Sequence, residues 1–273
     1  MKTAFKHSLA VAAFVAANAA QAQFIPFPPT LTSGSGTLAF SNDALNALKS
    51  SGVALATPNI IPAVSGVSTG GNANAGSYAA GSLNLTFSSV TTSGDHVSSL
   101  ASPDSFLRLR RSLVDENGNV EAQYSVYLTG FELDLNQSTV YANVFAATAG
   151  GGAATNLGRT ALFTATQVGI VGGTEGRIVF SNGPDGVPRP TASGNLAGGL
   201  RLNGAAGELI LSNLGLAALA TNPNDPLNRL WRDSNWGAVS FTAPAVPEPS
   251  SYALFGMGLL GVSAAVARRR AQA

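Results

Sequence analysis

The chain has 273 residues, of which 31 are glycine, 14 are proline and only 11% are charged. This composition is typical of a turn-rich protein, and the 45% hydrophobic content is too high for a wholly disordered chain. Cysteine is absent, which excludes disulfides, thiolate metal centres and thiol nucleophiles.

Residues 1–22 predict a secretory signal peptide. They combine a positively charged start with nine consecutive apolar residues at 9–17 and a small-x-small site formed by Ala20 and Ala22. Signal peptidase accepts such a site, so the mature chain is expected to begin at Gln23.

Residues 23–35 predict an extended leader, because they contain three closely spaced prolines. The following residues, 36–242, are numerous enough to bury a core and are expected to fold as one β-rich extracytoplasmic domain. Within this domain, the stretches 64–80 and 149–156 are rich in Gly, Ala, Ser and Asn, which predicts mobile loops and not domain linkers.

The body shows the alternation of apolar and polar residues that is typical of half-buried strands. Between Leu128 and Phe131 the apolar positions change from even to odd numbers, which predicts a bulge or turn at Gly130. Asn117 and Gly118 predict a hairpin turn. The expected fold class is mainly β, a single antiparallel β-sandwich-like domain with two short helices. Strands are expected at 83–88, 106–113, 124–128, 131–135, 140–147, 160–168, 176–181 and 237–242.

Two distant segments of the body resemble each other. Residues 36–48 and 207–219 match at seven of thirteen positions, and each predicts a short strand, a Ser or Asn helix cap and one or two amphipathic turns. Either the segments pack as a pseudo-symmetric pair at the ends of the sheet, or they merely share the chemistry of a helix cap.

Three polar groups invite comparison with catalytic or metal sites. Asp95 and His96 include the one histidine of the mature body, but no nucleophile elbow accompanies them, which favours a polar loop. Residues 115–119 begin like a calcium loop, although valines occupy the glycine and glutamate positions of an EF-hand. Glu132 and Asp134 share a strand face, as glycosidase carboxylates can, but a solvated face predicts the same pattern. We therefore expect no catalytic residue, metal site or cofactor.

Two arginines are candidate ligand-binding residues. Arg108 and Arg110 share one strand face, with Arg111 on the other, and guanidinium groups can hold acidic groups of a polysaccharide through paired hydrogen bonds. Cross-strand pairing with acids such as Glu121 is the alternative.

The two tryptophans are the other candidates for ligand binding. Sugar rings stack on exposed indoles, so Trp231 and Trp236 would serve a glycan site if they lie at the surface. Packing of both indoles in the core near the last strand is the alternative.

The C-terminal residues predict attachment to a membrane. Residues 243–251 form a proline-rich spacer, and residues 252–267 carry no charge. As a transmembrane helix, this run reaches about 24 Å, against about 30 Å for a hydrocarbon core. Residues 268–273 form a basic tail that should stay cytoplasmic, which places the body outside the inner membrane. The basic stop comprises Arg268, Arg269 and Arg270.

This tail resembles the PEP-CTERM sorting signal of Gram-negative bacteria. The resemblance covers the last 28 residues and rests on Val246, Pro247, Glu248 and Pro249, followed by a glycine-rich apolar run and the arginine cluster. It implies recognition by an exosortase, a membrane-embedded cysteine transpeptidase, with processing near the Pro-Glu-Pro site and association with the cell surface and exopolysaccharide. An ordinary C-terminal membrane anchor is the alternative.

The expected function follows from the N-terminal signal peptide, the C-terminal sorting tail and the charge of the body. Residues 23–246 carry ten cationic and thirteen acidic side chains, a formal charge of −3, which argues against a nucleic-acid partner. We expect a non-enzymatic cell-surface or extracellular-matrix protein that passes through an inner-membrane intermediate. A secreted glycan-binding module is the alternative.

A third interpretation comes from the strand pattern of residues 126–147 and the short helices, which faintly resemble secreted β-rich haem-uptake domains of the HtaA type. The resemblance does not identify a ligand-binding residue. The candidate tyrosines, which nothing in the sequence distinguishes, are Tyr78, Tyr124, Tyr127 and Tyr141.

Overall fold

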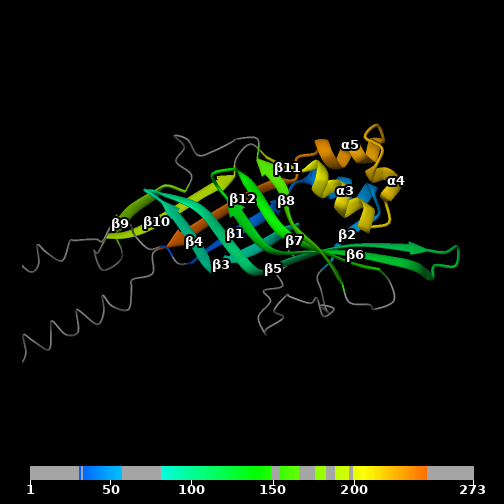
Figure 1. The fold of residues 1–273 in the computed structure, drawn as a ribbon, viewed down its shortest axis with the longest axis horizontal. Helices are drawn as coiled ribbons and strands as arrows, with labels where there is room; N and C mark the ends of the chain where they lie inside the picture. Colours follow the sequence, from blue (N-terminus) through cyan, green and yellow to red (C-terminus); the bar gives the residue numbers. More distant parts are fainter. Residues whose placement is uncertain are drawn as a thin grey trace, which may run out of the picture. The chain divides into compact units, whose positions relative to one another are not determined.

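The computed structural model shows the mainly β, antiparallel fold that the sequence predicts (Figure 1). The predicted signal peptide, most of the leader, the sorting tail and the stretch 64–80 lie outside the described residues. The structure describes residues 31, 33–56, 81–148, 154–165, 176–182, 188–196 and 199–244.

The first sheet has five strands and joins the two ends of the body. The first and last strands pair antiparallel, with Leu38 opposite Val239, and both side chains are fully buried. Burial alternates strictly along the last strand, which explains its recognition from the sequence. In spatial order the strands are β3 (Ser82–Phe87), β1 (Gly34–Phe40), β12 (Gly237–Pro244), β10 (Pro188–Leu196) and β9 (Ile178–Asn182).

The second sheet has seven strands and is built around a long hairpin. Its two longest strands pair along almost their whole length, and the turn between them is the predicted Asn117-Gly118 turn. In spatial order the strands are β11 (Leu200–Leu202), β8 (Thr155–Ala165), β7 (Thr139–Thr148), β6 (Val120–Asp134), β5 (His96–Val114) and β2 (Val53–Ala56), and β4 (Ser89–Ser93) also pairs with β5.

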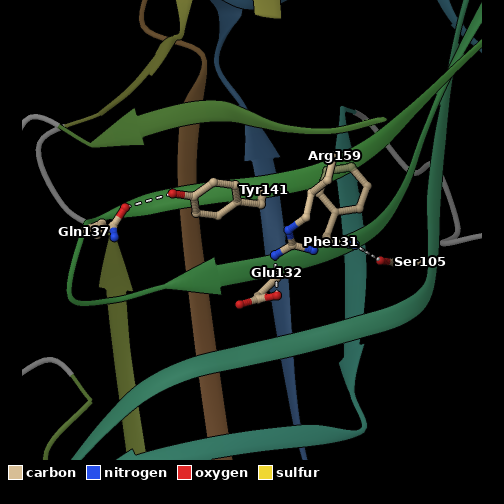
Figure 2. Close-up of polar contacts among 6 residues, drawn as sticks. All are labelled: Ser105, Phe131, Glu132, Gln137, Tyr141 and Arg159. Carbon is tan, nitrogen blue, oxygen red and sulfur yellow. Dashed lines mark hydrogen bonds and ion pairs between the residues drawn. The ribbon is translucent and has the colours of Figure 1, made fainter. Parts of the chain in front are cut away.

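The predicted irregularity at Gly130 is confirmed. The β6–β7 register shifts between Thr129 and Glu132, and Gly130 has a φ of 60°. The Ser105 hydroxyl accepts a hydrogen bond of 3.2 Å from the Phe131 amide, which provides an acceptor where the ladder is interrupted (Figure 2). The shift turns Phe131 and Leu133 toward the core, on which Val126 and Leu128 also pack from positions of the other parity.

The helices in the described part of the chain contact one another beside the sheets (Figure 1). Ser41 caps the first of them, as predicted, by accepting a hydrogen bond of 3.1 Å from the Ala44 amide. Helices and sheets contribute to one continuous hydrophobic core. The helices are α2 (Asn42–Ser50), α3 (Gly204–Asn213), α4 (Ala217–Ala220) and α5 (Pro226–Asp233).

The strand, cap and helical turns predicted for both segments form in 36–48 but not in 207–219, so the pseudo-symmetric pair, one of the two alternatives left open, is wrong. The first segment is a strand followed by a helix, whereas residues 207–211 lie inside α3, which Asn203 caps by accepting a hydrogen bond from the Ala205 amide. Buried residues recur in α3 at intervals of three and four, as Ala206 and Ile210 illustrate. Shared letters thus adopt different structures, and there is no pseudo-symmetric pair.

Candidate functional site

One sheet surface collects most of the polar candidates. We define the outer face as the surface of the seven-stranded sheet turned away from the core. In β5, Leu107 and Leu109 belong to the core, so Arg108 and Arg110 project from the outer face. Arg111 has the parity of the core residues, and the predicted division of the three arginines between two faces is confirmed.

Arg108 is held in place by the neighbouring strand. Its Nε and Nη2 groups donate hydrogen bonds of 3.1 and 2.9 Å to the Ser125 hydroxyl, and its guanidinium carbon lies 5.6 Å from the centre of the Tyr127 ring. Ser125 and Tyr127 are both buried. The guanidinium is therefore oriented in advance, and its Nη1 group makes no hydrogen bond to any residue that the structure describes.

Arg110 lies beside this pair and is exposed. It stands opposite Ser125 in the β5–β6 ladder, and its side chain has neither an ion pair nor a hydrogen bond within the described ranges. The expected alternative partner, Glu121, is not placed across from either arginine, because Arg108 stands opposite Tyr127 and Arg110 opposite Ser125. The ladder thus leaves Arg110 available for an external acidic group.

A second cluster on the outer face was not predicted from the sequence (Figure 2). Arg159 of β8 forms an ion pair with Glu132 of β6, and its guanidinium carbon lies 5.2 Å from the centre of the Tyr141 ring of β7. The Tyr141 hydroxyl donates a hydrogen bond of 2.8 Å to the Gln137 side chain. The outer face thus has two cation–π contacts, Arg108 with Tyr127 and Arg159 with Tyr141.

The carboxylates compared above with a glycosidase pair are both engaged by the fold. Glu132 pairs with Arg159, and Asp134 accepts a hydrogen bond of 3.0 Å from the Gln137 amide in the β6–β7 turn. A solvated strand face with structural contacts accounts for the pattern.

The tryptophans are buried, and the alternative of core packing is the one that the structure supports. Trp231 is 0% and Trp236 is 2% exposed, and their ring centres lie 5.1 Å apart. Each indole N–H donates within the core, to the Ser51 hydroxyl and to the Trp231 carbonyl respectively. Neither indole presents a face on which a sugar at the surface could stack.

His96 and its neighbours form a small charged group at the β4–β5 turn. The Nδ1 atom of His96 lies 2.6 Å from a carboxylate oxygen of Asp95, whose second oxygen lies 3.5 Å from Nε of Arg177. His96 also bridges to Arg177 through the backbone. These contacts tie the two sheets together near the turn and agree with a polar turn histidine.

The acidic turn at residues 115–119 closes on itself. The side-chain amide of Asn119 donates to one carboxylate oxygen of Asp115 at 3.0 Å, and the backbone amides of Asn119 and Asn117 donate to the other at 2.7 and 2.9 Å. These hydrogen bonds lower the pKa of Asp115. No group of metal-ligating side chains occurs in the described ranges, this turn included.

The tyrosines differ in their surroundings. Tyr124 packs against the core beneath Gly215, Tyr127 lies under Arg108, and Tyr141 lies beside Arg159. Tyr78 lies outside the described residues.

Comparison with known proteins gives one structural similarity for the body of the chain. No curated protein matches the chain. Among solved structures, the chain is similar to the C-terminal domain of HtaA from Corynebacterium glutamicum, with 12% identity and a TM-score of 0.34 over 78% of this chain and 97% of that one.

Within the described residues, every helix is too short or too polar to cross a membrane, and the predicted helix at 252–267 lies outside them. The family model for the PEP-CTERM protein-sorting motif matches residues 245–270, which include the Pro-Glu-Pro site, the apolar run and the arginine cluster. The chain therefore carries a C-terminal PEP-CTERM protein-sorting motif, which supports its identification as an exosortase-sorted protein.

Proposed function

We propose that the body is a non-enzymatic cell-surface or extracellular-matrix protein that associates with exopolysaccharide. The observation that carries the proposal is the sorting motif at residues 245–270, since a signal of this kind delivers the folded body outside the inner membrane. The N-terminal signal peptide predicted for residues 1–22 agrees with this route.

The contacts of the titratable groups support a role without turnover. Glu132 is paired with Arg159, Asp134 holds a turn, and Asp115 is surrounded by three donated hydrogen bonds. His96 is joined to its own neighbour Asp95. Each of these carboxylates, and the histidine, therefore makes a contact within the folded body.

The outer face is the part of the body that best fits an acidic polysaccharide. Arg110 is exposed without a partner among the described residues, and the neighbouring Arg108 keeps its Nη1 group free of hydrogen bonds to them. Guanidinium groups bind carboxylates and sulfates through paired, charge-assisted hydrogen bonds. Because the body as a whole is acidic, the attraction is local, and we expect it to weaken as salt is added.

Retention on native exopolysaccharide tests this function. The exported protein carrying Arg108→Ala and Arg110→Ala should be retained less than the parent chain. The matched control carries Arg229→Ala and Arg232→Ala, which remove two exposed charges from α5. Equal retention of both variants would reject the outer face as the binding site, and release of reducing sugar by the parent chain would overturn the non-enzymatic proposal.

A further inference from the structure

The exposed large hydrophobic side chains of the described residues lie in two places. Val114 and Val120 are each 59% exposed and stand opposite each other at the end of the β5–β6 hairpin. Val179 and Phe180 are 53% and 45% exposed and belong to β9, the edge strand of the five-stranded sheet. The described surface therefore has two small apolar patches, each at the margin of a sheet.

The two patches lie at opposite ends of the body. Arg177, which directly precedes β9, bridges to His96, the first residue of β5, whereas Val114 is the last residue of that strand. With 19 residues, β5 reaches up to about 60 Å at about 3.3 Å per residue. Figure 1 shows β9 at one end of the view and the end of the β5–β6 hairpin at the other. One copy of the chain therefore cannot bring its own two patches together.

The outer side of β9 offers backbone groups to a further strand. Phe180 stands opposite Pro190 of β10, and proline has no N–H with which to complete a hydrogen-bonded pair. The amide of Phe180 therefore points away from β10, as does that of Ile178, which donates a hydrogen bond of 2.7 Å to the Asp95 carbonyl. From Phe180 onward, no strand in the described part of the chain pairs with this side of β9. Such an edge is a template for the addition of another strand.

The end of the β5–β6 hairpin, residues 112–123, extends beyond the neighbouring strands. The described ladder between β2 and β5 stops at Arg111, and the one between β7 and β6 stops at Tyr124. Past these positions, β5 and β6 pair with each other and with no other strand that the structure describes. The hairpin end is thus a two-stranded ribbon whose edges can pair with a strand from outside.

The two patches differ in the sign of their charge. Residues 112–123 contain three acidic side chains and no basic one, a formal charge of −3. Residues 177–190 contain two arginines and one aspartate, a formal charge of +1. Opposite charges favour contact between the hairpin end and β9, whereas two hairpin ends would repel each other. The occupant that fits each patch is therefore the other patch on a second copy of this chain.

We propose that copies of the chain assemble head to tail, with the hairpin end of one copy added along the free edge of β9 in the next. Because an added strand lies beside β9, Val179 and Phe180 each gain a neighbour although they point to opposite faces of the sheet. The contact is heterologous, so every added copy leaves one hairpin end and one β9 edge free, and the assembly grows as an open filament. It does not use Arg108 or Arg110 and is separate from the polysaccharide site proposed above.

Sedimentation velocity of the protein recovered from the cell surface tests this contact with three variants. The hairpin variant carries Val114→Lys and Val120→Lys, which place charges on the exposed apolar pair. The edge variant carries Phe180→Pro, which removes the outward amide and the apolar side chain but no hydrogen bond to β10. The control Ser240→Lys places a charge at an exposed position of β12. Circular dichroism establishes that each variant keeps the β fold.

The parent chain and the control should form species that grow with concentration up to about 1 mM, since a contact of this size is weak. The hairpin variant and the edge variant should each stay monomeric. An equimolar mixture of these two should form a dimer and nothing larger, because each supplies the patch that the other lacks. A parent chain that stays monomeric would overturn the inference. Growth of the hairpin variant alone would assign the contact to two β9 edges, and growth of the edge variant alone to two hairpin ends, and either result would overturn the head-to-tail arrangement.

Single cysteines give a second test that does not depend on these substitutions, since the chain has no cysteine of its own. A Val120→Cys chain and a tagged Phe180→Cys chain are mixed under mild oxidation. Disulfide-linked dimers that contain both chains should exceed either homodimer several-fold. An excess of homodimers, or no linked product, would contradict the contact.

Discussion

The indole N–H of Trp231 donates a hydrogen bond of 2.6 Å to the hydroxyl of Ser51, across 180 residues of sequence. Ser51 ends α2, and its own hydroxyl donates to the Ala47 carbonyl at 2.8 Å. The Trp231 carbonyl in turn accepts a hydrogen bond of 2.7 Å from the Trp236 indole. This chain of buried hydrogen bonds connects α2, α5 and the start of β12, so the tryptophans organise the core and not the surface.

Removing the acceptor of Trp231 is expected to destabilise the body. Ser51→Ala leaves a fully buried indole N–H without its partner, at a cost of about 1–3 kcal/mol. Trp231→Ala, which also opens a cavity, should cost about 3–5 kcal/mol. Urea unfolding measures both free energies, with exposed Arg232→Ala as the control. A loss of less than about 0.5 kcal/mol in Ser51→Ala would contradict a structural role for this hydrogen bond.

Much of the fold was predictable because local signals agree with the tertiary structure. Burial alternates along β3 and β12, and the Gly130 irregularity follows from a change of parity. The Ser- and Thr-rich β4 and the first half of β5 were missed because they lack a clear apolar alternation. Pro103 and Asp104 lie at a register shift within one long strand.

Strand β10 was missed for a different reason. Proline cannot donate a hydrogen bond to a ladder, and Pro188 and Pro190 lie where β10 pairs with β9 alone, beyond the end of the β12 ladder at Pro244. The sequence does not reveal where a partner strand ends. β1 and β12 also reach two residues beyond the expected body of 36–242 at each end.

The candidate site was predictable only in part. Alternate residues of a strand point to opposite faces, which places Arg108 and Arg110 on one face and Arg111 on the other without knowledge of the neighbouring strands. The contact between Glu132 and Arg159 depends on the register of three strands, and the β7–β8 register shifts twice. Predicting this contact would require the two positions at which the β7–β8 register shifts, and the local sequence of β7 and β8 does not reveal them.

Two glycines with positive φ should respond very differently to substitution. A Cβ at Gly237, with φ of 127°, would lie 1.8 Å from the Ala39 carbonyl oxygen in the β1–β12 pair, so Gly237→Ala should cost at least about 4 kcal/mol. At Gly118, with φ of 82°, nothing lies within 4 Å, so Gly118→Ala should cost only the backbone strain of about 1 kcal/mol. Thermal unfolding distinguishes them, and similar melting temperatures would contradict the β1–β12 register.

The acidic turn predicts a pH dependence. Hydrogen bonds from Asn119 and Asn117 lower the pKa of Asp115 in the folded state relative to the unfolded chain. The stabilisation is therefore fully present above the unfolded pKa of about 4 and is lost as pH falls through the lower folded value. Asp115→Asn should reduce the loss of stability below pH of about 4, measured by urea unfolding, and NMR titration should find the carboxyl pKa below its ordinary range. An ordinary pKa in that titration would refute the arrangement of the turn.

Neighbouring arginines on opposite faces should separate stability from binding. Arg111 donates hydrogen bonds of 3.2 Å to the carbonyls of Leu214 and Gly215 at the end of α3, so Arg111→Ala should destabilise the body by about 1 kcal/mol and leave retention on exopolysaccharide unchanged. Arg110→Ala should do the reverse, since Arg110 is exposed and has no described partner. Urea unfolding and polysaccharide retention are both measured on Arg110→Ala and on Arg111→Ala, so that stability and binding are compared in each variant. Any loss of binding confined to Arg111→Ala would move the site away from the outer face.

The sorting tail is expected to be a temporary anchor that is removed during processing. The uncharged run at residues 252–267 reaches only about 24 Å as a helix, less than a hydrocarbon core of about 30 Å, and the Pro-Glu-Pro site directly precedes it within the matched motif. Mass spectrometry of protein recovered from the cell surface should therefore find no peptide beyond about Ser250. Glu248→Ala should increase the amount of uncleaved chain in the inner membrane, because Glu248 belongs to the matched sorting motif. The control Glu208→Ala removes an exposed charge from α3 and should be processed normally. Recovery of an intact 252–270 segment from mature surface protein would show that the tail is a permanent anchor.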